Sequence, residues 1–261
     1  METTNWVILV IGIVCVIIGL VLVFFGTRSR KKLMVIKETP TVTAAEAAQM
    51  ADAVGKPRVE IKGTAVSEKP LTSPASNTPC LYYKYKVERR IERETRDAEG
   101  NWDTEYHWET LESGEENIPF ILRDASGDIW VAPQGAHFVA DKKVDREDIG
   151  PGFGSRSTGS VLGDLADGFL DSLSGHREYA AGIRVQEHVI ALDQPTYVLG
   201  IASRSADGTV SLGKGEGPFI ISFKSEEELT KKFGRNYILQ YVFGAILAVG
   251  GVAAAIVGAV I

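Results

Sequence analysis

Few residues in this chain have side chains suited to chemistry, and they are widely spaced. Cys80 is the thiol outside the apolar ends of the chain. A nucleophilic cysteine needs a nearby base and an environment that lowers its pKa. The sequence around Cys80 offers no base, so we interpret it as a small, half-buried strand residue. The second cysteine, Cys15, lies in a long apolar run, and the two predict neither a disulfide framework nor a Cys-rich zinc site.

Three carboxylates form a second candidate site. Asp164, Asp167 and Asp171 would share one face of a helix. A cation needs more oxygen ligands than these usually bring together, so we interpret them as the solvated face of an amphipathic segment. The histidines are scattered and lack ligand spacing: His107, His137, His176 and His188. The sequence thus predicts no catalytic residue, no cofactor and no metal site.

A glycine-rich segment, residues 213–217, is a third candidate. Phosphate-binding loops follow a strand and open a helix, whereas this segment precedes a strand pattern. We therefore interpret it as a hairpin turn.

The clearest pattern in the chain predicts a long β-hairpin. Residues 80–96 alternate apolar with charged side chains, and residues 102–110 alternate aromatic or threonine with acidic or histidine side chains after a polar turn. The basic outgoing strand can pair with the acidic return strand. We expect four aromatic residues on one face, either as core, which we prefer, or as a binding surface. These are Tyr83, Tyr85, Tyr106 and Trp108. In the core interpretation, the tip near Gly100 is the expected contact point.

Further strand patterns predict a β-rich domain between the apolar ends. They cover residues 58–66, 179–192, 196–203 and 218–223, and a second hairpin spans residues 118–132 with its turn at 124–127. Two capping boxes predict short helices, one from Thr43 and Glu46 over residues 44–54, the other from Ser225 and Glu228. Residues 150–175 are rich in Gly and Ser and predict a loop, with a short helix favoured by the spacing of Leu162, Leu165, Phe169 and Leu173.

The apolar ends each predict a transmembrane helix. Residues 6–25 and 237–261 carry no charged side chain, and about 20 apolar residues cross the hydrocarbon core. Basic residues follow the first run and precede the second, whereas a cleavable signal peptide carries its positive charge in front. They are Arg28, Arg30, Lys31, Lys32, Lys231, Lys232 and Arg235. The positive-inside rule then predicts a multi-pass cell-membrane protein with a cytoplasmic central domain and both termini outside.

The expected layout follows from these elements. It comprises a tail (1–5), transmembrane helix 1 (6–26), a basic link with a short helix (27–57), a β-rich domain (58–224), a short helix (225–236) and transmembrane helix 2 (237–261). The fold class is α+β, and a small, partly open barrel is one form such strands can take. The acidic balance, a net charge of -6, argues against nucleic acid as the main partner and leaves the lipid bilayer and a protein.

Small residues in the last run permit close helix contact. Gly251-x-x-x-Ala255 and Ala254-x-x-x-Gly258 are suited to such packing, and Gly12 and Gly19 can supply a matching groove. We expect helix pairing within one chain or between copies, so a homo-oligomer is one predicted outcome.

Several short segments, taken in order, carry a family resemblance. They read Gly-Thr-Ala at 63–65, Pro-Leu-Thr-Ser-Pro-Ala-Ser at 70–76, Pro-Cys-Leu-Tyr-Tyr-Lys-Tyr at 79–85, Pro-Phe-Ile-Leu-Arg-Asp at 119–124, Glu-His-Val-Ile at 187–190, Tyr-Val-Leu-Gly at 197–200 and Ile-Ile-Ser at 220–222. Their order resembles the GIDE domain, also called the beside-a-membrane (BAM) domain, of mitochondrial E3 ubiquitin ligases with two spans. The likeness covers the chain from about Val59 to the second apolar run.

One departure from that family alters the expected function. The eukaryotic ligases carry a zinc-binding RING after their second span, whereas this sequence ends within that run and lacks the cysteines a RING needs. It looks like a RING-less, prokaryotic member. The expected function is a membrane-anchored, non-catalytic scaffold that recruits a protein partner. The alternative is an E3 ubiquitin ligase-related component that uses a RING from another protein, and an unrecognised hydrolase is a weaker third.

Overall fold

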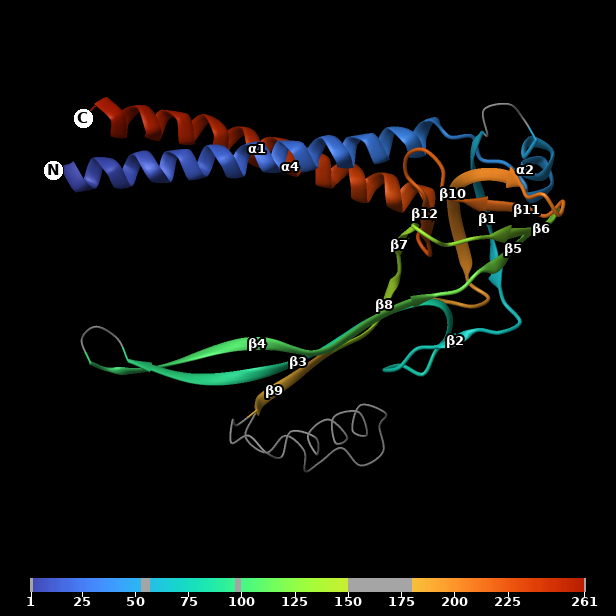
Figure 1. Cartoon of the computed structure of the whole chain (residues 1–261), viewed down its shortest axis with the longest axis horizontal. Helices are drawn as coiled ribbons and strands as arrows, with labels where there is room; N and C mark the ends of the chain where they lie inside the picture. Colours follow the sequence, from blue (N-terminus) through green and yellow to red (C-terminus); the bar gives the residue numbers. More distant parts are fainter. Residues whose placement is uncertain (1, 53–56, 97–99, 150–179, 261) are drawn as a thin grey trace. The chain divides into compact units, whose positions relative to one another are not determined.

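A computed structural model describes residues 2–52, 57–96, 100–149 and 180–260 (Figure 1). The chain divides into two compact units. One contains residues 1–41 with 224–261, and the other contains residues 42–223. The expected loop at 150–175, its short helix and Asp164, Asp167 and Asp171 lie outside the described residues.

The first unit is a pair of long helices. Helix α1 covers Glu2–Glu38 and α4 covers Glu226–Val260. Both are long and apolar enough to cross a membrane, and many of their large apolar side chains are exposed. The structure differs from the expected layout, since the basic link stays helical to Glu38 and the expected 225–236 helix continues into the second apolar run. No proline interrupts either helix. The Ser225–Glu228 capping box is present.

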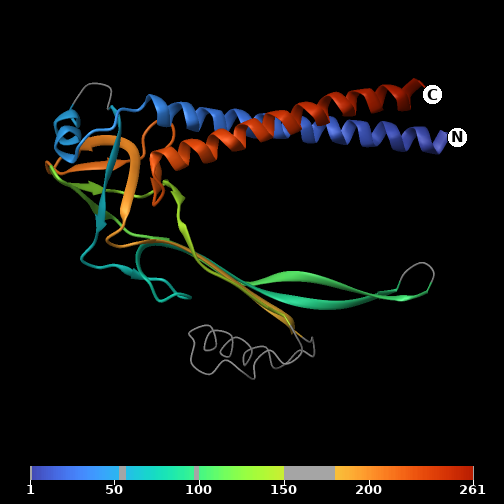
Figure 2. The same ribbon diagram turned by 180° about the vertical axis from the view of Figure 1, so that it is seen from behind.

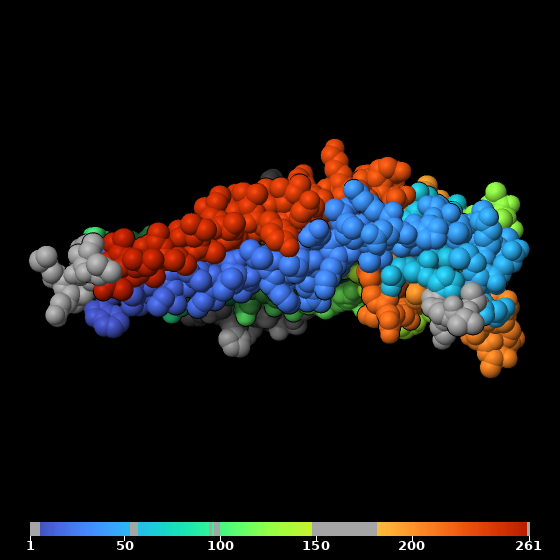
Figure 3. Space-filling view, turned by 90° about the horizontal axis from the view of Figure 1, so that it is seen from above, coloured from blue at the N-terminus to red at the C-terminus, as the bar shows by residue number. Residues whose placement is uncertain are grey.

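The two helices lie side by side with their backbones in close contact (Figure 3). A Cβ atom placed on Gly12 would lie 2.5 Å from the backbone nitrogen of Ala255, and one on Gly19 would lie 2.7 Å from that of Ala248. The glycines are seven residues apart, so they recur on the same side of the helix. The expected pairing of Gly251 and Ala255 with Gly12 is therefore confirmed within the chain.

Part of the second unit is a closed five-stranded barrel. Its strands are β1 (Arg58–Val66), β5 (Phe120–Asp124), β6 (Gly127–Val131), β11 (Val210–Gly213) and β10 (Pro195–Arg204), and β10 pairs with β1 to close the ring. Strands β12 (Ile220–Ser222) and β7 (His137–Val139) belong to the same sheet: β12 pairs with β10 on the edge that β11 also uses, and β7 pairs with β12. The core includes Val59, Ile61, Leu122, Val198 and Leu212, all fully buried. A β-rich α+β fold with a small barrel is confirmed, and the ring is closed.

The short helix α2 (Ala44–Met50) is capped by a turn of the barrel. Its Thr43–Glu46 capping box is present. The β5–β6 turn supplies two further acceptors, because Asp124 Oδ2 accepts from the Ala44 N–H at 2.7 Å and Ser126 Oγ accepts from the Ala45 N–H at 3.0 Å. Burial opposes ionisation of Asp124, but hydrogen bonds from Ser126 Oγ and from backbone N–H groups outweigh it and lower its pKa. The predicted hairpin turn at 124–127 thus also holds a helix.

A second sheet carries the long hairpin. It contains β2 (Leu71–Thr72), β3 (Pro79–Arg96), β9 (Ala180–Ala191) and β8 (Asp141–Ile149) in that order, with β4 (Trp102–Asn117) paired to β3. The hairpin and the strands expected near 179–192, 196–203 and 218–223 are confirmed. Strand β8 was not expected because most of its residues are charged and give no apolar alternation.

Candidate functional site

The β3–β4 hairpin extends beyond the rest of its sheet (Figures 1 and 2). In the described part of the chain, β9 pairs with β3 only as far as Ile91. Beyond that point β3 and β4 pair with each other alone, from Glu92 opposite Tyr106 to Arg96 opposite Trp102. We call residues 88–96 and 100–110 the distal hairpin. Its ladder positions each side chain on one of two opposite faces.

A β-bulge decides which side chains share a face. Val87 lies opposite Glu112, but the next residue, Glu88, lies opposite Thr110, so Leu111 is the extra residue. A shift of one residue moves every following side chain to the other face. The prediction that Tyr83 and Tyr85 share a face with Tyr106 and Trp108 is therefore wrong. The strand pattern was expected to end near Thr110, just before Leu111, so the extra residue lay outside the predicted strand.

One face of the distal hairpin carries arginines stacked on aromatic rings. We call it the aromatic face, defined by Trp102, Tyr106 and Trp108. The Arg90 guanidinium carbon lies 3.8 Å from the centre of the Tyr106 ring, and that of Arg184, on β9, lies 4.1 Å from the Trp108 ring. The Arg96 guanidinium lies 5.7 Å from Trp102. Guanidinium groups at these distances stabilise the rings by cation–π attraction and restrict their motion.

Two of these three aromatic side chains are exposed to solvent, and Trp108 is half-buried. Trp102 is 69% exposed and Tyr106 is 49% exposed. The preferred interpretation of the hairpin aromatics as core is therefore wrong for this face. Large exposed rings held by arginines are typical of contact surfaces rather than of protein interiors.

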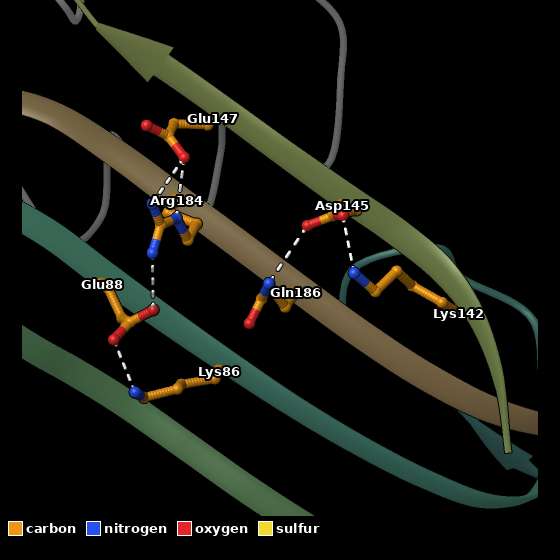
Figure 4. A network of polar contacts seen from close by, with 7 residues as sticks. All are labelled: Lys86, Glu88, Lys142, Asp145, Glu147, Arg184 and Gln186. Carbon is orange, nitrogen blue, oxygen red and sulfur yellow. Dashed lines mark hydrogen bonds and ion pairs between the residues drawn. The ribbon is translucent and has the colours of Figure 1, made fainter. Parts of the chain in front are cut away.

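The base of the distal hairpin is joined to β9 and β8 by an ion-pair network (Figure 4). Arg184 on β9 donates to Glu147 on β8 at 2.6 Å and lies 3.9 Å from Glu88 on β3. Glu88 also pairs with Lys86 at 2.5 Å. A parallel contact links Gln186 on β9 to Asp145 on β8. The same guanidinium that stacks on Trp108 thus ties three strands together.

On the other side of the bulge, the face of the hairpin opposite the aromatic face carries two tyrosines bound to β4 carboxylates. Tyr83 donates to Glu116 at 2.6 Å and Tyr85 donates to Glu112 at 2.5 Å. These hydrogen bonds favour the neutral phenols and raise the pKa of each tyrosine to about 12. The expected charge pairing across the ladder is confirmed, as Lys84 contacts Glu115 at 2.9 Å and Arg89 contacts Glu109 at 2.6 Å.

A buried carboxylate holds the loop between β2 and β3. Glu187 on β9 is fully buried and accepts hydrogen bonds from the N–H groups of Ala75, at 2.7 Å, and Ser76, at 3.1 Å. The Ser76 hydroxyl also donates to Glu187. Hydroxyl contacts then link Ser76 to Ser73 and Thr78. Sequence patterns gave no sign of this site, because its partners are more than 100 residues away.

Cys80 lies close to this buried carboxylate. The thiol is fully buried, and burial, reinforced by the negative charge of Glu187, raises its pKa to about 11. A thiol with this pKa is a poor nucleophile at neutral pH. Cys80 lies on strand β3 as expected, but its side chain is fully buried rather than half-buried.

His176 lies outside the described residues, and the other histidine candidates do not converge on one place. His107, His137 and His188 lie on β4, β7 and β9. Among the described residues, no three or more His, Cys, Asp or Glu side chains are grouped as metal ligands would be. The glycine-rich segment after β11 leads to β12, and both strands pair antiparallel with β10 on the edge opposite β1, so it joins two successive strands along one edge rather than forming the turn of a hairpin.

The sequence was compared with known protein families, curated proteins and solved structures. The family model GIDE, described as E3 Ubiquitin ligase, matches residues 88–257, which is more than half of the chain and runs from the distal hairpin into α4. No curated protein and no solved structure matches. The resemblance seen in the short sequence segments is therefore confirmed, and the chain belongs to the GIDE family.

Proposed function

We propose that this protein is a membrane-anchored recruiting module whose distal hairpin binds a protein partner. The single observation that carries the proposal is the aromatic face, on which Trp102 and Tyr106 are exposed and stacked by Arg96 and Arg90. Aromatic and arginine side chains supply most of the energetically dominant contacts in protein interfaces. Rings already held in place lose little entropy when a partner binds.

The two apolar helices support an anchoring role. We propose that the central domain is cytoplasmic and that both termini lie outside, because basic residues flank the domain side of each apolar run. A protease added to intact cells should then leave the central domain uncut. Digestion from outside the cell would contradict this orientation.

The experiment that tests recruitment compares two exposed tryptophans. Trp102→Ala with Tyr106→Ala should remove from membrane co-purifications the proteins that bind the intact chain. Trp130→Ala is the matched control, because Trp130 is 47% exposed on β6 of the barrel. Retention of every partner by the hairpin variant would refute the proposal, as would equal losses in both variants.

A ligase-related role is the second candidate function, favoured by the description of the matching family. In this reading the chain recruits a substrate or a RING-bearing protein, and the partner supplies the zinc-dependent transfer step. RING-bearing or ubiquitin-like proteins among the partners lost from the hairpin variant would support it. Partners with neither feature would favour the plain scaffold.

We also propose that α4 can contact a second copy of the chain. A Cβ atom on Gly250 would meet no atom within 4 Å, so small residues remain on α4 away from the α1 contact. The mass of the detergent-solubilised protein tests this, and a monomer at all concentrations would count against it.

A further inference from the structure

Strand β4 forms an open edge of its sheet. In the described part of the chain it pairs only with β3. Every side chain from Trp102 to His107 is exposed, on both faces of the strand. An edge strand presents backbone N–H and C=O groups that another extended chain can pair with. The length and exposure of β4 provide such an edge over its distal half.

The charges along this edge indicate what charge a chain that pairs with it should carry. Strand β4 carries six acidic residues and no lysine or arginine: Asp103, Glu105, Glu109, Glu112, Glu115 and Glu116. Residues 88–110 together hold eight acidic and four basic residues. Like charges repel, so the edge disfavours a second copy of β4 and an anionic lipid surface. A basic segment is the complementary occupant.

The two faces of β4 carry different kinds of side chain. Trp102, Tyr106 and Trp108 lie on the aromatic face, and Asp103, Glu105 and Glu109 lie on the opposite face. A strand added beside β4 alternates its side chains in the same way. One set of its side chains would lie beside the aromatic rings and the other beside the carboxylates.

We propose that the distal half of β4 binds an extended segment of a partner protein by strand addition, and that this segment alternates basic with apolar residues. The inference rests on the proposed recruiting function and specifies how the partner is held. Main-chain hydrogen bonds to β4 provide affinity, and the alternation provides specificity.

The test uses the full chain in lipid nanodiscs and a fluorescent peptide of alternating lysine and valine, about nine residues long to match the edge. The peptide should bind saturably, and hydrogen exchange at residues 102–110 should slow when it binds. Protection confined to the other edge strand, β8, would overturn the proposal. A peptide of the same composition with all lysines before all valines should bind at least about tenfold more weakly.

Backbone pairing is tested by methylating peptide nitrogens. One peptide is methylated on its lysines and a second on its valines, so that in each case one edge of the added strand cannot donate. One of the two should lose binding while the other keeps it, because only one edge faces β4. Equal binding of both peptides would overturn strand addition and leave side-chain docking.

Protein variants complete the test. Asp103→Lys with Glu105→Lys should weaken peptide binding about tenfold or more. Glu68→Lys with Glu216→Lys makes the same charge change at exposed positions outside the hairpin and should leave binding nearly unchanged. Equal losses in both variants would overturn the proposal in favour of general charge attraction. If the Trp102 and Tyr106 variant loses cellular partners but no basic peptide adds to β4, the recruiting function stands and this inference fails.

Discussion

The helix pair α1–α4 and the strand pair β3–β4 are both antiparallel, yet opposite features hold them together. The helices approach closely because Gly12 and Gly19 carry no side chains where the backbones meet. The strands beyond the bulge are held by a ladder, by the Arg89–Glu109 ion pair and by stacked rings, and most of their side chains stay in solvent. The helix contact depends on glycines, so it should not tolerate a larger side chain at those positions. The hairpin contact is made by exposed side chains, so it should tolerate the loss of one of them.

The same contrast separates anchoring from recognition. The contact between α1 and α4 is made by backbone atoms and small residues, and the outer surface of the helix pair is apolar. The distal hairpin keeps its rings and charges accessible. Its stability depends on a few buried contacts near its base. The buried contacts that stabilise the sheet and the exposed side chains that could bind a partner therefore lie in different parts of it.

The largest expected effect tests the seam of the helix pair. Gly12→Leu and Gly19→Leu place side chains where a Cβ alone would lie within 3 Å of the α4 backbone, so each should cost about 1–3 kcal/mol of helix-pair stability. Thermal unfolding of the full chain in detergent measures this. Gly234→Leu is the matched control on the same helix, since its Cβ would meet only Leu33 Cδ2, at 4.0 Å. Similar losses in the control would remove the distinction between the two kinds of pair.

The next effect concerns a buried contact of the same sheet, outside the strand pair, that should tolerate no loss. Glu187→Ala leaves the buried N–H groups of Ala75 and Ser76 without their acceptor, which should cost about 1–3 kcal/mol. Denaturant unfolding measures the cost, and Glu187→Gln should lose less because it keeps one acceptor oxygen. The comparison is weakened if the alanine variant is as stable as the parent.

A smaller effect is expected on the exposed face. Arg90→Ala removes the stack on Tyr106 and should cost only about 0.5–1 kcal/mol. Arg93→Ala, at an exposed position of the same strand, is the control and should cost less. Chemical-denaturation midpoints of the two variants decide the matter. A loss as large as that of Glu187→Ala would show that the hairpin depends on its exposed side chains after all.

The smallest effect appears only in alkali. The pKa values of Tyr83 and Tyr85 rise from 10.0 to about 12 because each phenol donates to a carboxylate. Since the folded values are raised, this contribution to stability is complete below pH 10 and is lost as the pH rises through about 12. Phenolate absorbance should therefore show two tyrosines that ionise near pH 12 in the folded protein, beside Tyr82, whose pKa is also raised by burial. Tyr83→Phe with Tyr85→Phe should remove them, and an unchanged titration would contradict the assignment.

Local patterns in the sequence determined much of this protein. Unbroken apolar runs define α1 and α4, because a helix that is apolar on every face is stable only when a membrane or a protein core surrounds it. Capping boxes placed the starts of α2 and α4, and strand patterns placed β3, most of β4 and the barrel strands other than β11. Each of these signals lies within a few residues of the element it defines.

Only the tertiary structure decided which of those elements act together. The barrel closes through β10 and β1, and β6 pairs with β11, which lies far away in the sequence. The bulge at Leu111 exchanged the two faces of the hairpin and separated Tyr83 and Tyr85 from Tyr106 and Trp108. Glu187 gained its role from a loop more than 100 residues earlier. Side-chain periodicity describes a single strand, whereas register, closure and burial depend on the partner strand, and a local pattern does not encode that partner.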